Sequence, residues 1–254
     1  MSGVAGAAHQ NPSTPPSTVG ILGGMGPAAG VDFARLFVRA SERWLRSHGH
    51  PVQDQAFPEH WIAQVPVADR TQALRDPAAP QPLEDLATAL RRLDMLGARA
   101  VAMSCNTAHA WHGALQTRVP GVELLLIAQE TAAELRRRGI GRAALLATQG
   151  TYRMGLYDEA LAAHGIECLL PSEQAREWLM EGIYEGVKAG NMPLARSRFV
   201  DACQQVLGLH GDVALVMACT EIPLALPDAP QAGGWTLIDP SDILATALAQ
   251  RAYG

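Results

Sequence analysis

Short apolar runs and longer segments with helical spacing of apolar residues alternate along the chain from residue 19 to its end. Short apolar runs are typical of buried strands, and apolar residues three or four apart are typical of helices that bury one face. The predicted strands span 19–22, 61–66, 99–103, 124–127, 142–147, 167–170, 212–219 and 235–238. The predicted helices span 28–44, 83–96, 130–138, 152–164, 173–188, 194–209 and 241–252. Because strands and helices alternate throughout, we expect an α/β fold with parallel sheets.

Two of the predicted strands lead into a cysteine and a polar turn. Cys105 follows one apolar run and precedes Asn106 and Thr107, while Cys219 ends another run and precedes Thr220. Backbone N–H groups at the start of a helix stabilise a thiolate, which is the reactive form of cysteine. Ligands of parallel sheets bind at the carboxyl ends of strands, so we expect both thiols to face one cleft.

The repetition of this unit indicates two similar halves. We expect two doubly wound parallel-sheet lobes related by a pseudo-twofold axis, with the candidate site in the cleft between them. The first lobe is expected to comprise 19–128 plus 229–254, so that the last strand and helix return to it, and the second lobe 129–228. Residues 1–18 are rich in Ala, Ser, Pro and Gly, which predicts a disordered tail.

The composition indicates a globular protein and argues against several function classes. The 254 residues are 48% hydrophobic, which is enough for a sizeable core. The net charge of −5 provides no basic field, so we expect no nucleic-acid partner. No apolar run has the length of a membrane span and the start of the chain does not resemble a secretory signal, so we expect a cytoplasmic protein with no membrane partner.

The cysteine spacing and the glycine-rich turn exclude two further kinds of site. None of the four cysteines forms a Cys-x-x-Cys pair, so we expect reduced thiols, with Cys168 and Cys203 as core residues. The turn at 23–27 lacks the Lys-Ser/Thr of a phosphate-binding loop and the full spacing of a dinucleotide fingerprint, so the sequence does not favour a nucleotide-binding role for it.

Five motifs occur in order along the chain. They are Gly20-Ile-Leu-Gly-Gly-Met-Gly-Pro27 with Asp32-Phe33, Asp69-Arg-Thr71, Cys105-Asn-Thr-Ala-His109, Glu181-Gly-Ile-Tyr184 with Lys188-Ala-Gly190, and Cys219-Thr-Glu-Ile-Pro223. Together they resemble the cofactor-independent aspartate/glutamate racemases, in particular the aspartate racemase branch. The Gly-Gly-Met turn favours this branch, because the glutamate racemases usually open with an acidic Asp-Ser-Gly turn. Met103-Ser104 and Ala218 depart from the family pattern, but both cysteines are in place.

The chemistry of racemisation agrees with the two thiols. Inverting an α-carbon requires a base on each face, one to remove a proton and one, already protonated, to return a proton from the other side. A cysteine with an ordinary pKa of about 8.5 can serve in either state after a modest environmental shift. The resemblance implies that Cys105 and Cys219 are these bases and that neither a cofactor nor a metal is needed. Asn106, Thr107 and Thr220 are candidates to hold the α-carboxylate and the developing negative charge.

A dicarboxylic substrate needs a second anion site. The resemblance assigns substrate carboxylate binding to Arg70 and Lys188, and an arginine can form a bidentate clamp on a carboxylate. The alternative is that both are surface residues, with Arg70 paired to a neighbouring aspartate. The turns at the strand ends provide three further substrate-binding candidates, Met25, Thr148 and Thr151.

Several readings stay open from the sequence. His109 could orient a thiol or simply pack, and Glu221, counted among the substrate-binding candidates, could tune Cys219 or cap the following helix. The same superfamily includes malonate decarboxylases, against which Cys105 counts, and maleate isomerases, which also keep two cysteines. A third class is a non-catalytic binding protein or thiol redox sensor, which predicts a disulfide between the cysteines or a dispensable thiol. Relatives are commonly dimers, so we expect a homodimer.

Overall fold

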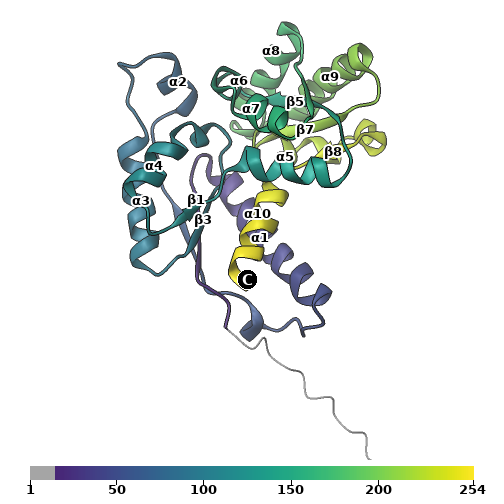
Figure 1. Ribbon diagram of the computed structural model, residues 1–254. Helices are drawn as coiled ribbons and strands as arrows, with labels where there is room; N and C mark the ends of the chain where they lie inside the picture. Colours follow the sequence, from purple (N-terminus) through teal and green to yellow (C-terminus); the bar gives the residue numbers. More distant parts are fainter. Residues whose placement is uncertain (1–14) are drawn as a thin grey trace, which may run out of the picture.

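The computed structural model describes residues 15–254, and in this part of the chain it contains two lobes, each built on a four-stranded sheet (Figure 1). All strand pairs are parallel, in the orders β2-β1-β3-β4 and β6-β5-β7-β8. The strands are β1 Val19–Gly23, β2 His60–Gln64, β3 Ala100–Met103, β4 Glu123–Leu124, β5 Arg142–Ala147, β6 Glu167–Leu169, β7 Ala214–Ala218 and β8 Leu237–Ile238. The predicted α/β fold with two parallel-sheet lobes is therefore confirmed.

Helices cover both faces of each sheet. They are α1 Pro27–Ser47, α2 Arg70–Arg75, α3 Leu83–Met95, α4 His112–Arg118, α5 Ile127–Arg137, α6 Gln149–Met154, α7 Leu156–Ala163, α8 Glu173–Glu181, α9 Met192–His210 and α10 Pro240–Tyr253. Short 3-10 turns occur at Asp54–Ala56, Thr107–Trp111, Ile222–Leu224, Leu226–Asp228 and Pro230–Gly234, and α8 continues into a π-helical turn at Gly182–Val187. None of the helices in the described residues is long and apolar enough to cross a membrane.

Four apolar clusters, one on each face of each sheet, form the core. In the first lobe, α1 and α10 place Phe37 and Leu248 on one face, and α3 places Leu90 on the other. In the second lobe, α9 packs Phe199 on one face, and α7 packs Tyr157 on the other. This burial on both faces explains why the strands read as continuous apolar runs and not as alternating ones.

The C-terminal segment corrects the predicted division into lobes. The last strand, β8, does not return to the first lobe but pairs with β7, with Leu237 opposite Leu215 and Ile238 opposite Val216. Its Ile238 is 1% exposed and lies in a core cluster of the second lobe. Only α10 returns to the first lobe, where it packs beside α1 (Figure 1). The second lobe therefore extends beyond residue 228, because the edge of β7 accepts one more short strand before the chain crosses back.

Local differences from the predicted elements have identifiable causes. The strand predicted at 124–127 stops at Leu124, since Ile127 already begins α5. The helix predicted at 152–164 is two helices, because Gly155 adopts a left-handed conformation (φ 61°) between α6 and α7. Residues 1–14 of the predicted tail lie outside the described residues. Ser17 already donates a backbone hydrogen bond to Ala252 O at 2.7 Å, so ordered contacts begin slightly before β1.

Candidate active site

The carboxyl ends of β3 and β7 bring the two predicted thiols to one small cavity between the lobes. Cys105 follows β3 and Cys219 follows β7, and each is 6% exposed. The cavity has a volume of about 20 Å³. Its lining comprises Met25, Asp69, Arg70, Thr71, Cys105, Thr107, Thr148, Tyr184, Lys188, Cys219, Thr220 and Glu221. Two sulfurs delivered by different lobes thus face the same space.

The segment after Cys105 differs from the predicted helix start. Thr107–Trp111 forms a 3-10 turn, and α4 begins only at His112. A single short turn provides little of the partial positive charge expected of a longer helix. The positive group beside Cys105 is instead the guanidinium of Arg70, which reaches it from the start of α2.

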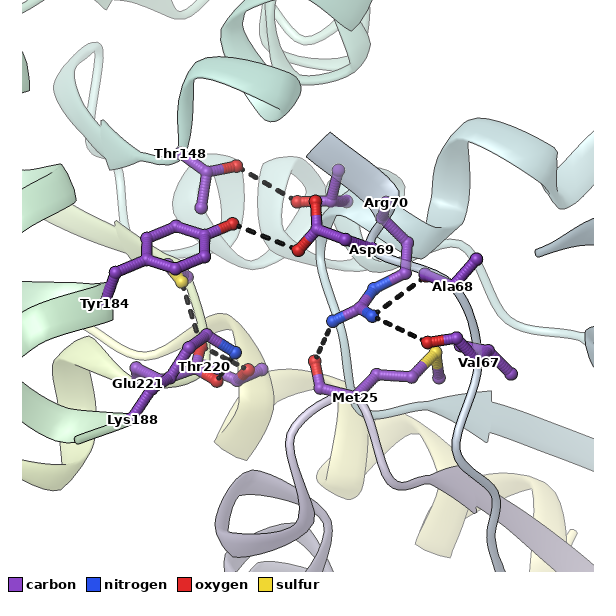
Figure 2. Close-up of polar contacts among 12 residues, drawn as sticks. Met25, Val67, Ala68, Asp69, Arg70, Thr148, Tyr184, Lys188, Thr220 and Glu221 are labelled. Atoms are coloured by element: carbon purple, nitrogen blue, oxygen red, sulfur yellow. Dashed lines mark hydrogen bonds and ion pairs between the residues drawn. The ribbon is translucent and has the colours of Figure 1, made fainter. Parts of the chain in front are cut away.

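Arg70 is held in the cavity wall by backbone carbonyls. Its Nη2 donates to Met25 O at 2.7 Å and its Nη1 to Ala68 O at 3.1 Å (Figure 2). Burial opposes the charge of this guanidinium, but the neighbouring Cys105 sulfur favours it, and the pKa of Arg70 lies above its ordinary value. The alternative of a purely surface arginine does not fit these contacts.

Asp69 makes other hydrogen bonds than the ion pair with Arg70 that the surface alternative would require. Its Oδ1 accepts from Gln72 N at 2.7 Å and so caps α2. Its Oδ2 accepts from the Tyr184 hydroxyl at 3.4 Å, a contact between the two lobes (Figure 2). Asp69, Thr71 and Tyr184 line both the small cavity and an adjoining outer pocket of about 610 Å³.

Cys219 lies in a different electrostatic environment from Cys105. Its Sγ donates to Glu221 Oε2 at 3.0 Å, and the Thr220 hydroxyl donates to the same oxygen at 3.3 Å. The other carboxylate oxygen, Oε1, pairs with Lys188 Nζ at 2.9 Å. Burial and the charge of Glu221 both raise the pKa of the Cys219 thiol well above its ordinary value.

Lys188 belongs to the cavity and not to an exposed helix end. It follows the π-helical turn, and its ammonium group lies 5.7 Å from the ring centre of Tyr184. Burial opposes the charge of Lys188, but the Glu221 carboxylate favours it and raises the pKa of the ammonium. The cavity therefore contains two cations, one from each lobe.

Three threonine hydroxyls form a cluster across the cleft. Thr107 Oγ1 lies 3.0 Å from Thr148 Oγ1 and 3.2 Å from Thr151 Oγ1, and the latter two are 3.2 Å apart. Thr148 also accepts from Thr151 N at 3.3 Å, so it caps α6. Thr107 and Thr148 line the cavity, whereas Thr151 holds the other two from behind.

Asn106 lies beneath the cavity lining. Its Oδ1 accepts a hydrogen bond of 2.5 Å from the Tyr157 hydroxyl of the second lobe. Within the described part of the chain, its Nδ2 is buried and has no hydrogen-bond partner. Asn106 thus joins the lobes through its oxygen and keeps an amide donor without a protein acceptor.

His109 supports the first cysteine turn through the backbone. Its Nδ1 lies 2.9 Å from Cys105 O, the geometry of a donor to that carbonyl. Burial lowers the pKa of His109 to about 4, so the ring is neutral at neutral pH. The contact fits the packing interpretation of His109, with the added task of fixing the turn.

The cysteines and the other possible metal ligands add two findings. All four cysteines are free, so the disulfide expected of a redox sensor does not form in this structure. Among residues 15–254, no three His, Cys, Asp or Glu side chains are grouped closely enough to hold a metal ion.

The structure also adds residues that the sequence did not single out as site residues. Asp69, Thr71 and Tyr184 stand inside two of the five motifs, and their place in those motifs was the available signal. Their side chains come together only because α2 of the first lobe meets the π-helical turn of the second.

Comparisons with known proteins agree with this architecture. The family profile of Asp/Glu/hydantoin racemases matches residues 22–248. Among solved structures, an aspartate racemase of Picrophilus torridus is 26% identical and superposes with a TM-score of 0.75, covering 93% of this chain and 94% of that one. A putative Asp/Glu racemase of Yersinia pestis is 23% identical, with a TM-score of 0.76 and coverage of 94% and 100%. A glutamate racemase of Bacillus anthracis is 15% identical, with a TM-score of 0.63 and coverage of 92% and 80%.

Proposed function

The chain belongs to the Asp/Glu/hydantoin racemase family, and from this premise we propose that it racemises an acidic amino acid, most readily aspartate, without a cofactor. The observation that carries the proposal is the pair of thiols, Cys105 and Cys219, that line one cavity from two lobes. A cleft between such lobes allows one base to approach each face of a substrate carbon, which is the requirement for inversion.

In the proposed reaction the two sulfurs exchange protons with opposite faces of the α-carbon. One thiolate takes the α-proton as the Cα–H bond breaks, and the electron pair stays on the carbon and its carboxylate. The other thiol donates its proton to the opposite face, which forms the new Cα–H bond. The two cysteines have then exchanged protonation states, so each can act first on one enantiomer.

Fixed charges and donors support the carbanion and select the substrate. Arg70 and Lys188 provide two cations for a dicarboxylate, and the guanidinium can bind a carboxylate through two hydrogen bonds. We assign the α-carboxylate to Thr107, Thr148, Thr220 and the free Nδ2 of Asn106. A buried donor without a protein acceptor is costly unless a ligand satisfies it, which favours this role for Asn106.

The preference for aspartate rests on two supports. The Gly-Gly-Met turn resembles the aspartate racemase branch, and Met25, whose carbonyl accepts from Arg70, lines the cavity. The similarity in fold is also greater to the Picrophilus enzyme than to the Bacillus glutamate racemase, with TM-scores of 0.75 and 0.63.

The test is exchange of the α-proton in heavy water. Incubation with L-aspartate should remove the α-proton signal in the NMR spectrum and produce D-aspartate. Cys105→Ala and Cys219→Ala should each abolish racemisation in both directions, whereas Cys168→Ala, a free cysteine outside the cavity, should retain it. Full racemisation by either cavity variant would refute the two-base mechanism, and a faster reaction with glutamate would refute the substrate preference.

A further inference from the structure

The two thiols of the site differ in the charges that touch them. Cys105 faces the guanidinium of Arg70, and a neighbouring cation favours a thiolate. Cys219 faces the carboxylate of Glu221 at 3.0 Å, and a neighbouring anion disfavours a thiolate. The asymmetry lies in the neighbouring side chains, because both cysteines come shortly after corresponding strands of the two sheets, β3 and β7.

Glu221 is arranged to accept hydrogen bonds and not to cap a helix. Its side chain makes no capping bond to the 3-10 turn Ile222–Leu224 and is 4% exposed. Its Oε1 lies 2.9 Å from Lys188 Nζ, so the buried carboxylate forms an ion pair with a cation. The other oxygen, Oε2, accepts a hydrogen bond from the Cys219 sulfur at 3.0 Å, and this contact favours the protonated thiol over the thiolate.

We propose that Glu221 is a positioning residue that holds the proton on Cys219 and directs its S–H, so that Cys219 is a thiol in the resting enzyme. The proposal rests on the function proposed above and deepens it. In the resting enzyme, Cys105 is the base and Cys219 is the acid. The substrate enantiomer whose α-proton points toward Cys105 can therefore react with the resting enzyme without a prior change in the protonation of the thiols.

One turnover in that direction reverses the two states. The α-proton passes to Cys105, the Cys219 proton passes to the α-carbon, and the enzyme is left with a Cys219 thiolate next to the Glu221 carboxylate. Two adjacent anions are unfavourable, and the ion pair with Lys188 offsets this in part. The resting state returns when Cys219 takes up a proton from solvent and Cys105 releases one, and Glu221 favours this return.

Enantiomer kinetics alone do not measure this asymmetry. The two enantiomers of an amino acid have equal free energies, so kcat/KM must be equal in both directions when the enzyme forms interconvert freely. The protonation of each thiol must therefore be read directly. Alkylation by iodoacetamide provides this reading, since its rate follows the thiolate fraction.

The ionisable groups around Cys219 define the pH range in which its alkylation rate reports the ionisation of its own thiol. The ionisable neighbours are Glu221 and Lys188, Cys105 across the cavity, and the hydroxyls of Tyr152, Tyr157 and Tyr184. Burial raises the pKa of all three tyrosines, and that of Lys188 is raised by Glu221 despite burial. Between about pH 6 and 10 these tyrosines stay neutral and the lysine stays charged, so changes in Cys219 reactivity report the thiol.

The experiment measures the alkylation rate of each cysteine against pH by peptide mass spectrometry, without substrate. In the wild type, Cys219 should react only at a pH well above that of an ordinary cysteine thiol, because burial and Glu221 raise its pKa. Glu221→Gln should lower the midpoint of Cys219 by about one pH unit or more, which is at least a tenfold change in proton binding. Glu221→Asp retains the charge and should restore most of the wild-type midpoint. Glu181→Gln, which removes a carboxylate paired with Arg198 outside the cavity, is the matched control and should change neither midpoint.

The outcomes separate this proposal from the proposed function. An unchanged Cys219 midpoint in Glu221→Gln, or a wild-type Cys219 that reacts at the pH of an ordinary cysteine thiol, overturns the role of Glu221. Should Glu221→Gln fail to fold, Glu221→Ala removes the carboxylate without adding a buried amide and must give the same lowering. If the midpoints behave as expected but no amino acid is racemised, the role of Glu221 stands and the proposed function fails.

Discussion

Gly186 is a point at which the π-helical turn of the site packs directly against the backbone of α9. A Cβ added to Gly186 would lie 2.7 Å from Ala195 Cβ, 2.8 Å from Ala195 Cα and 3.0 Å from Ala195 N. Ala195 is fully buried, and two of these atoms belong to the backbone of a helix. Gly186→Ala must therefore push the turn and α9 apart, because no flexible side-chain end can give way.

The magnitude follows from two opposing effects. Overpacking of this kind costs typically about 1–3 kcal/mol. Replacing glycine by alanine in a helix returns up to about 1 kcal/mol, but only where the backbone keeps its place. We expect Gly186→Ala to lower the free energy of unfolding by about 1–2 kcal/mol. The matched control is Gly208→Ala in α9, which has no atom within 4 Å of the new Cβ and should be stabilised by about 0.5–1 kcal/mol.

Urea unfolding followed by circular dichroism measures both variants. Gly186 lies between Tyr184 and Lys188, and both line the cavity, so Gly186→Ala should also raise the KM for aspartate, whereas Gly208→Ala should not. A Gly186→Ala protein that unfolds at the wild-type urea concentration or above would show that α9 and the turn adjust freely. That result would refute the argument that this close contact positions the two side chains.

Three further predictions concern charged and titratable groups. Arg70→Ala should lower kcat/KM for aspartate far more than for a neutral amino acid, because a buried carboxylate loses its bidentate partner at a cost of about 2–5 kcal/mol. An unchanged ratio of the two kcat/KM values would show that Arg70 does not bind the substrate carboxylate. Lys188→Ala should lower the affinity for dicarboxylate inhibitors such as succinate, and inhibition constants equal to those of the wild type would contradict its role. His109 has a folded-state pKa of about 4 against an ordinary value of 6.5, so its contribution is complete above pH 6.5 and is lost as the pH falls toward 4. Over that range the wild type should lose about 3 kcal/mol of unfolding free energy relative to His109→Asn, and parallel stability curves from pH 7 to 4 would show that the buried ring does not titrate as described.

The fold and the two thiols could be predicted because they depend on local patterns. Apolar runs buried on both faces of a sheet identify β3 and β7, and each is followed within two residues by a cysteine. The pairing of β8 with β7 could not be predicted in this way. A strand of two residues carries too little pattern, and its partner is decided by which sheet edge lies within reach of the preceding turns.

The candidate site could be predicted as a set of residues, but not as a network. The sequence singles out Arg70 and Lys188, yet it does not reveal that Met25 O accepts from the first or that Glu221 pairs with the second. It likewise leaves open whether Glu221 caps a helix or contacts a thiol. These contacts depend on side-chain directions and on how two lobes meet, which no spacing along the chain encodes.

The small volume of the cavity has a consequence for how substrate enters the site and how product leaves it. A space of about 20 Å³ holds little more than one water molecule, so the dicarboxylic substrate of the proposed reaction would reach the sulfurs only when the lobes separate. Separation must break the contacts that bridge the cleft, such as Tyr184 with Asp69 and Thr107 with Thr148. For the proposed reaction, these contacts hold the cleft closed during the chemical step. They form after the substrate has bound and keep bulk water, a source of protons, away from the short-lived carbanion. They must break again before either enantiomer can leave.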